Sequence, residues 1–173
     1  MTCKVGGLAG LGSSEAKAEI SLLKKTFTVG EVMTVNVLMD NSKCKKKVKN
    51  FKIKLKRHIE CLYKNGSIIW SQDEEICGQK YAGVAEKAPA EQKALEFTIP
   101  KLERDFGAAQ FHILQPGFDQ MTLASSTETP MFRIEYSLQV FVKHDSKLEF
   151  GQGNFVDFSF EIRSAPQSLP EQI

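Results

Sequence analysis

The stretch DNSKCKKKVKNFKIKLKRH, from Asp40 to His58, decides the fold and also concentrates the positive charge of the chain. Apolar and basic residues alternate through its second half, in the order Phe51, Lys52, Ile53, Lys54, Leu55 and Lys56. Successive side chains of a β-strand point to opposite faces of the sheet. The alternation therefore predicts a strand whose apolar side chains face the core, while its three lysines share the outer face.

The same period of two recurs along most of the chain. It runs through Thr34–Met39, Leu95–Ile99, Phe132–Val142 and Val156–Ile162. Turn-forming residues separate these runs at Asp40–Ser42, Asn65–Gly66, Asp145–Ser146 and Gly151–Asn154. Only Gly83–Leu95 has a helix-like composition, and we interpret it as a loop because Pro89 interrupts it and no apolar stripe forms. The sequence thus predicts an all-β fold, an antiparallel two-sheet β-sandwich of immunoglobulin-like type.

Length and composition indicate an ordinary single domain. A chain of 173 residues with 42% hydrophobic and 25% charged residues can bury a core without disulfides or metals. It has no apolar run of membrane-spanning length and no secretory signal. These features predict a cytoplasmic protein, which could also bind to membranes as a peripheral protein. The cysteines are Cys3, Cys44, Cys61 and Cys77. Since no two have zinc-knuckle or redox-pair spacing, we expect free thiols and neither a metal nor a cofactor.

The ends of the chain differ in composition from its middle. Residues 1–15 are rich in glycine and small side chains, which predicts a flexible leader. Gly7 and Gly12 have the spacing of a phosphate-binding loop, but the lysine that such a loop requires does not follow. Residues 164–173 contain two prolines and no apolar period, which predicts a disordered tail. The folded domain is therefore expected over residues 16–163.

The near-neutral composition hides a polarised charge distribution. From Asp40 to Lys64 there are ten basic residues and two acidic ones, whereas the rest of the chain has 13 basic and 19 acidic residues. Five of the lysines fall in the turn before the basic strand: Lys43, Lys45, Lys46, Lys47 and Lys49. One interpretation is that the lysines only solvate the outer face and discourage aggregation. The other is that they attract phosphate groups, over about one Debye length of 8 Å at physiological salt.

Four segments resemble the C-terminal domain of the arrestin family, most closely that of the α-arrestins. They are AEISLLKKTFTVGE, VNVLMDNSKCKKKVKNFKIKLKR, LASSTETPMFRIEYSLQVFV and FSFEI, which begin at Ala18, Val35, Leu123 and Phe158. Their order and spacing carry the resemblance, which covers roughly Ala16 to Arg163. It implies a non-enzymatic adaptor for membrane-protein trafficking or signalling. The implied partners are membrane cargo proteins or receptors, an N-terminal arrestin domain of the same protein, and trafficking or ubiquitination machinery bound through regions outside this chain.

The resemblance also implies a lipid-binding face. In several relatives, basic residues of the long strand bind inositol phosphates or phosphoinositide head groups, and Lys52 and Lys56 correspond to them, with Lys54 beside them. The candidate phosphate-binding residues are Lys46, Lys47, Lys49, Lys52, Lys54 and Lys56. One departure concerns the buried acidic pair by which receptor-binding arrestins sense phosphorylation. Asp119 lies near one such position and its acidic partner is missing from residues 107–115, so this mechanism is not expected.

Three other classes of function are weighed against the adaptor. The histidines His58, His112 and His144 are isolated, with His58 expected at a strand end, and Ser125–Ser126 lack nucleophile-elbow glycines, so catalysis is not expected. A nucleic-acid-binding sandwich would use the same lysines, but it would normally add arginine or aromatic side chains on that surface, and nucleic acid is not expected. A retromer-type sorting subunit shares the arrestin fold and stays open as an alternative.

Overall fold

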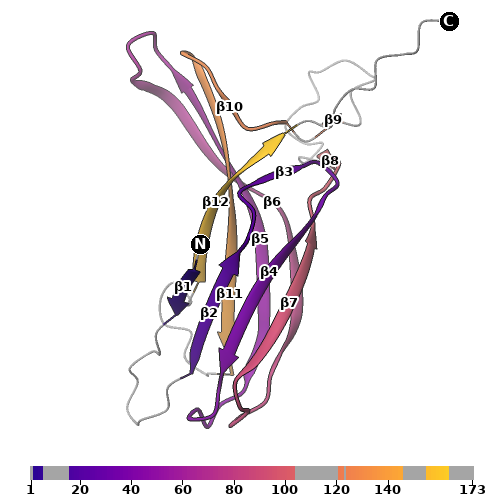
Figure 1. Cartoon of the computed structure of the whole chain (residues 1–173). Coiled ribbons are helices and arrows are strands. Elements are labelled where there is room, and N and C mark those ends of the chain that lie inside the picture. Colours follow the sequence, from indigo (N-terminus) through magenta and orange to yellow (C-terminus); the bar gives the residue numbers. More distant parts are fainter. Residues whose placement is uncertain (1, 6–15, 104–120, 123, 146–154, 164–173) are drawn as a thin grey trace, which may run out of the picture.

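The protein is built from two stacked sheets, as expected. The computed structural model describes residues 2–5, 16–103, 121–122, 124–145 and 155–163, and all regular elements in these ranges are strands (Figure 1). One sheet has the order β1 (Thr2–Val5), β2 (Lys17–Leu22), β4 (Val32–Asp40), β7 (Glu91–Thr98). The other has the order β3 (Thr26–Thr28), β12 (Phe155–Arg163), β11 (Phe132–His144), β5 (Val48–Leu62), β6 (Ile68–Val84), and β10 (Thr127–Glu128) also pairs with β11. The short β8 (Leu102–Glu103) and β9 (Met121–Thr122) pair separately.

Alternation along each long strand builds the core between the sheets. Phe51, Ile53 and Leu55 of β5 are completely buried, and in register they lie beside alternate residues of β11. The buried side chains of the opposite sheet include Ile20, Met33, Val35, Val37 and Met39. Because each buried Leu, Ile, Val or Phe side chain contributes roughly 1.5–3 kcal/mol of hydrophobic free energy, this two-sided alternation is the main stabilising term. The sequence-based prediction of a β-sandwich is confirmed.

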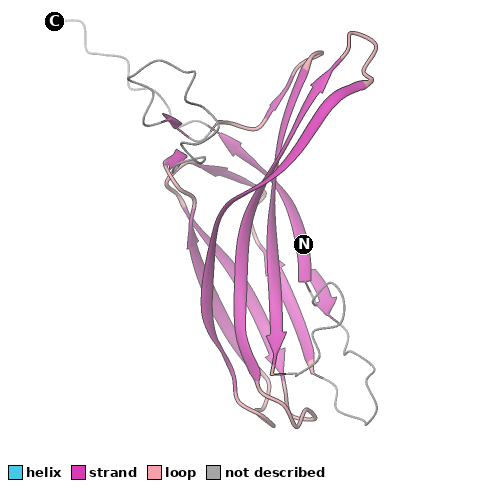
Figure 2. Ribbon diagram, turned by 180° about the vertical axis from the view of Figure 1, so that it is seen from behind, coloured by secondary structure: helices cyan, strands magenta, loops and turns pink. Residues whose placement is uncertain are grey.

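The hairpin of β5 and β6 is much longer than the strands of the opposite sheet. In Figures 1 and 2 the turn end of this hairpin extends beyond the two-layer body, together with β10 and the start of β11. We call this part the distal arm: residues 57–74 of the hairpin, and residues 127–135 of β10, β11 and their turn. The sheet of β1, β2, β4 and β7 does not extend along the turn end of the distal arm, whereas Ile134 at the base of the arm still belongs to the core.

Two expectations about local structure need correction or addition. The segment Gly83–Leu95 has no helix, but only residues 85–90 connect strands, because Glu91–Leu95 already belong to β7 and pair with β4. Backbone pairing with a neighbouring strand thus overrides the helix-like composition. Within the expected leader, Thr2–Val5 form β1 against β2.

Some sequence predictions lie outside the described residues: the tail 164–173, the turn Gly151–Asn154, and the assignments of His112 and Asp119. The domain boundaries stay predictions. In the portion described, no helix has the length and apolar character needed to cross a bilayer.

Candidate functional site: a basic surface on the β5 sheet

The turn between β4 and β5 holds its lysines away from the core. Asn41 is completely buried, and its side-chain amide donates hydrogen bonds to the carbonyl oxygens of Lys46 (3.0 Å) and Ala85 (2.7 Å). Cys44 is also buried, and its N–H donates to the carbonyl oxygen of Asn41 at 3.0 Å. These anchors leave four exposed lysines in the turn, Lys43, Lys45, Lys46 and Lys47, whereas Lys49, which the sequence placed in the turn, is already the second residue of β5. We call these five exposed lysines the basic turn.

Little in the described structure neutralises the basic turn. Lys47 is 3.7 Å from the carboxylate of Asp145, and both side chains are more than half exposed. The other four lysines form no ion pair with any residue in the described ranges. The pKa of the nearby Asp40 is lowered, first by hydrogen bonds from Ser42 and then by Lys17 and Lys43, so its carboxylate offsets only part of the charge of the turn. The basic turn therefore carries a positive charge that is open to solvent.

The three strand lysines share one face of β5, as predicted. Lys52, Lys54 and Lys56 lie in register opposite Phe141, Gln139 and Ser137 of β11, which alternate with buried residues of that strand. We call this the lysine face. Its charge is partly compensated, since the Lys52 ammonium is 3.8 Å from the Glu75 carboxylate and the Lys54 ammonium contacts the same group.

The neighbourhood of Lys52 also affects its proton affinity. Burial lowers the pKa of Lys52, the attraction of Glu75 opposes this change, and repulsion from Lys54 and Lys80 adds to it. Lys80 lies directly opposite Lys52 in the β5–β6 register. An anion that reached this group would relieve the repulsion among the three ammonium groups.

Lys56 differs from its two neighbours. It makes no hydrogen bond or ion pair with a described residue. It lies at a half-open hollow of about 300 Å³ on the outer face of the sheet. The residues that line this hollow are Lys56, Arg57, His58, Asp73, Glu135, Tyr136, Ser137, Gln139, Asp157 and Ser159. The Lys56 ammonium is therefore the cation of the lysine face that a ligand can reach without first breaking an ion pair.

The sign of the charge changes farther along β5. His58 is not at a strand end, as the sequence reasoning expected, but within β5, because the strand continues to Leu62. Its two ring nitrogens are 2.7 Å from Asp73 and 3.1 Å from Glu60. These hydrogen bonds, with Glu60 first, raise the pKa of His58. Glu60 also accepts a hydrogen bond from Arg133 at 3.0 Å, so this end of the outer face is an acidic network and not a basic one.

Sequence reasoning missed the acidic residues that face the lysines across the hairpin. Glu75 lies opposite Lys56, and Glu74 lies opposite Arg57. The sequence contains a signal for this pairing, because Lys56 precedes Asn65 by nine residues and Glu75 follows Gly66 by nine residues. Counting outward from a hairpin turn gives the register of its strands. The local excess of positive charge on the lysine face is therefore smaller than the composition of β5 suggests. It is larger at the basic turn than on the lysine face.

No group of three or more His, Cys, Asp or Glu side chains in the described ranges could hold a metal ion. The described cysteines Cys44, Cys61 and Cys77 are free thiols. Burial raises the pKa of Cys77 to about 11, which leaves little thiolate near neutral pH.

Comparison with known proteins places the whole folded region in one family. The family model described as arrestin (or S-antigen), C-terminal domain, matches residues 13–163. Comparison with curated proteins found no match to this chain. The match agrees with the two stacked sheets and with the resemblance carried by the four sequence segments.

Proposed function

The chain belongs to the family of arrestin C-terminal domains, and from this premise we propose that it is an adaptor domain that holds membrane cargo proteins or receptors at phosphoinositide-bearing membranes. Arrestin C-terminal domains are generally non-catalytic and imply an arrestin-like adaptor. The observation that carries the lipid part of the proposal is the exposed basic turn, in which four of the five lysines form no ion pair with a described residue. The ligand would be the phosphorylated head group of a phosphoinositide.

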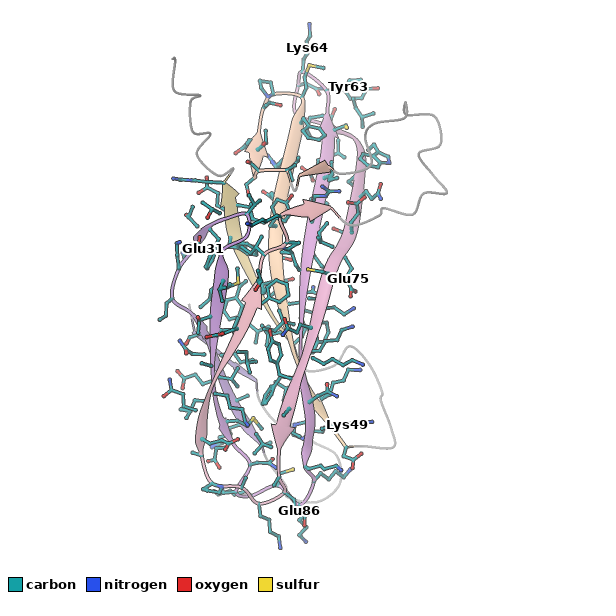
Figure 3. The ribbon with its side chains drawn as sticks, turned by 90° about the vertical axis from the view of Figure 1, so that its right-hand side faces the viewer. Glu31, Lys49, Tyr63, Lys64, Glu75 and Glu86 are labelled. Atoms are coloured by element: carbon teal, nitrogen blue, oxygen red, sulfur yellow. The ribbon has the colours of Figure 1, made fainter. Side chains whose placement is uncertain are left out.

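The arrangement of the lysines suits a membrane surface better than a deep pocket. The basic turn lies at one extremity of the molecule, where Figure 3 shows Lys49 and Glu86, and it can approach a flat bilayer without obstruction from the sandwich. Each lysine near an anionic bilayer contributes about 1 kcal/mol of attraction. Lys46, Lys47 and Lys49 would contact the surface first. Lys52, Lys54 and Lys56 would provide a second row of cations along β5, in which Lys56 is the most accessible.

One observation supports a second candidate, single-stranded nucleic acid. Phe141 and Phe155 lie on the outer face with their rings 5.2 Å apart, and the Lys54 ammonium is 5.6 Å from the Phe141 ring. Nucleic-acid-binding surfaces combine aromatic rings with cations in this manner. The two rings pack on each other, however, which leaves less ring area for bases. A retromer-type sorting subunit would share the fold and differ in its partner proteins.

Vesicle co-sedimentation tests the proposal. Phosphatidylcholine vesicles with and without phosphatidylinositol bisphosphate are mixed with the wild-type chain, with K46A/K47A/K49A, and with K52A/K54A/K56A. The matched control is K25A/K64A/K101A, which removes the same charge away from the basic turn. Loss of three lysines is expected to weaken binding about 100-fold, from about 1 kcal/mol for each lysine.

The outcomes separate the candidates. Equal sedimentation with both kinds of vesicle, or an equal loss in the control variant, would overturn the lipid proposal. Binding to a fluorescent oligonucleotide at physiological salt that fails in F141A, together with no phosphoinositide dependence, would establish the nucleic-acid candidate instead.

A further inference from the structure

We propose that the distal arm is a docking site for an extended, basic segment of a partner protein, which adds as a strand to the free edge of β6. This site lies at the opposite end of the molecule from the basic turn, as the positions of Tyr63 and Lys64 against Lys49 and Glu86 show in Figure 3. The inference is therefore independent of lipid binding, and both ends can be occupied at the same time.

The end of the distal arm exposes large apolar side chains. Tyr63, Ile68, Ile69, Trp70 and Met131 have exposed fractions of 58%, 56%, 54%, 46% and 61%. They come from the hairpin turn, from the start of β6 and from the turn between β10 and β11. Single exposed apolar residues are ordinary, but five of them at one end of the molecule indicate an interaction site. Aromatic residues such as Trp70 and Tyr63 are also those that contribute most to binding at protein interfaces.

The edge of β6 supplies the second element of the site. β6 is the last strand of its sheet and runs for 17 residues, and only β5 pairs with it within the described ranges. Near its C-terminal end the Tyr81 hydroxyl donates to the carbonyl oxygen of Glu96 at 2.6 Å, which ties this part of β6 to the opposite sheet. Beside the distal arm, none of the strands β1, β2, β4 and β7 of the opposite sheet lies alongside β6. An open edge of this kind offers its backbone groups to an added strand.

Charge indicates the chemistry of the partner. The distal arm has three basic residues against five acidic ones: Arg57, Lys64 and Arg133, and Glu60, Asp73, Glu74, Glu128 and Glu135. An anionic bilayer attracts basic segments, so it is disfavoured here. A second copy of the chain would bring a second acidic arm against the first, which is also unfavourable. A segment with lysine or arginine is complementary.

The order of residues along β6 makes the prediction more specific. Its free edge begins with the apolar run Ile68–Trp70 and continues with Asp73, whose side chain is 75% exposed. Side chains of an added strand lie beside those of the strand with which it pairs. The docked segment should therefore have apolar or aromatic residues next to Ile68–Trp70 and a basic residue next to Asp73.

Selection from a displayed library of random peptides, with the whole chain as bait, tests this inference. Peptides with alternating β-branched or aromatic residues and a basic end are expected to be enriched. I69K should weaken their binding about tenfold or more, since it replaces an interface apolar side chain by a repelling charge. Ile69 is suited to this change because a register shift leaves it without a partner on β5. L38K, on the exposed face of β4, is the matched control and should bind normally.

A charge exchange gives an independent check. D73K should weaken binding of the selected peptides. Peptides in which lysine is replaced by glutamate should restore binding to D73K. Amide hydrogen exchange should slow in β6 and not in β7 when a peptide is bound. Enrichment of acidic peptides, no enrichment above an unrelated bait, or equal binding by I69K and L38K would overturn the proposal. Dimerisation in sedimentation that I69K abolishes would also overturn the proposal, because a second copy would then occupy the distal arm. A blue shift of Trp70 fluorescence on neutral vesicles would overturn it too, because a bilayer would then be the occupant.

Discussion

Removing one partner of the ion pair between Arg57 and Glu74 should destabilise the domain much more than replacing both partners by apolar residues. Arg57 faces inward from β5, on the same side as Leu55, and lies in register beside Tyr136. Its Nη2 and Nε atoms are 2.6 Å and 2.9 Å from one carboxylate oxygen of Glu74. The two side chains are 8% and 13% exposed. The pair therefore stands at the boundary between the sandwich core and the distal arm.

The structure permits an estimate of what removing the carboxylate costs. At a separation of 2.6 Å and an effective dielectric constant of about 20, the attraction is about 6 kcal/mol before desolvation. Both groups have lost most of their hydration, and breaking a buried pair costs roughly 3–5 kcal/mol. The amide of E74Q still accepts a hydrogen bond, so we expect about 3 kcal/mol of destabilisation. R57M/E74M should lie within about 1 kcal/mol of the wild type, because apolar side chains of similar volume avoid the desolvation cost.

Urea unfolding measures both effects. Far-UV circular dichroism follows the whole sandwich, and fluorescence of Trp70, the single tryptophan, follows the distal arm. With a slope of about 2 kcal/mol/M, the E74Q midpoint should fall by about 1.5 M. An E74Q variant within about 0.5 kcal/mol of the wild type would refute the reasoning, because that is the range of ordinary surface substitutions. A double variant less stable than E74Q would refute it as well.

Four further predictions concern pH, thiol reactivity and backbone geometry. The pKa of His58 is raised in the folded state from its unfolded value of 6.5. The stability that this shift gives is present below pH 6.5 and is lost as the pH rises through the folded pKa. H58Q should therefore flatten the decline of stability above pH 6.5. For His144 the sign is opposite, because burial and then Lys46 lower the pKa of its imidazole. The domain therefore loses stability as the pH falls below 6.5. H144Q should flatten this loss in thermal melts at graded pH. With its pKa raised to about 11 from 9.0, Cys77 should be alkylated about 100-fold more slowly in the folded chain than in urea, and equal rates by mass spectrometry would contradict this. A Cβ on Gly83 would lie 1.8 Å from the Val48 carbonyl oxygen, so G83A should lower the urea midpoint more than G66A, which has a positive φ of 82° and open space around it.

Much of the local structure could be predicted from the sequence, because alternation is a property of neighbouring residues. Phe51 is buried and Lys52 is on the outer face since an extended chain turns successive side chains to opposite sides. The exposed lysines of the basic turn follow in the same way from a polar segment between two such strands. No distant contact is needed to reach these conclusions.

The strength and the sign of the charge on each part of the surface depend on residues that are distant along the chain. Glu75 compensates Lys52 and Lys54 because β6 folds back on β5, and Arg133 joins Glu60 through a strand 73 positions away. Composition alone made the whole of β5 look basic. The register of the hairpin divides it into a lysine face and an acidic distal arm.

The order of side chains along this chain determined by itself which of them are buried in a sandwich and which meet water, because that choice is made within each strand. Which charges meet, and which edge of a sheet stays open, was decided only by the tertiary structure. Hydrogen-bonded pairing sets those neighbours at a distance of a few ångströms, over which Coulomb energies change steeply.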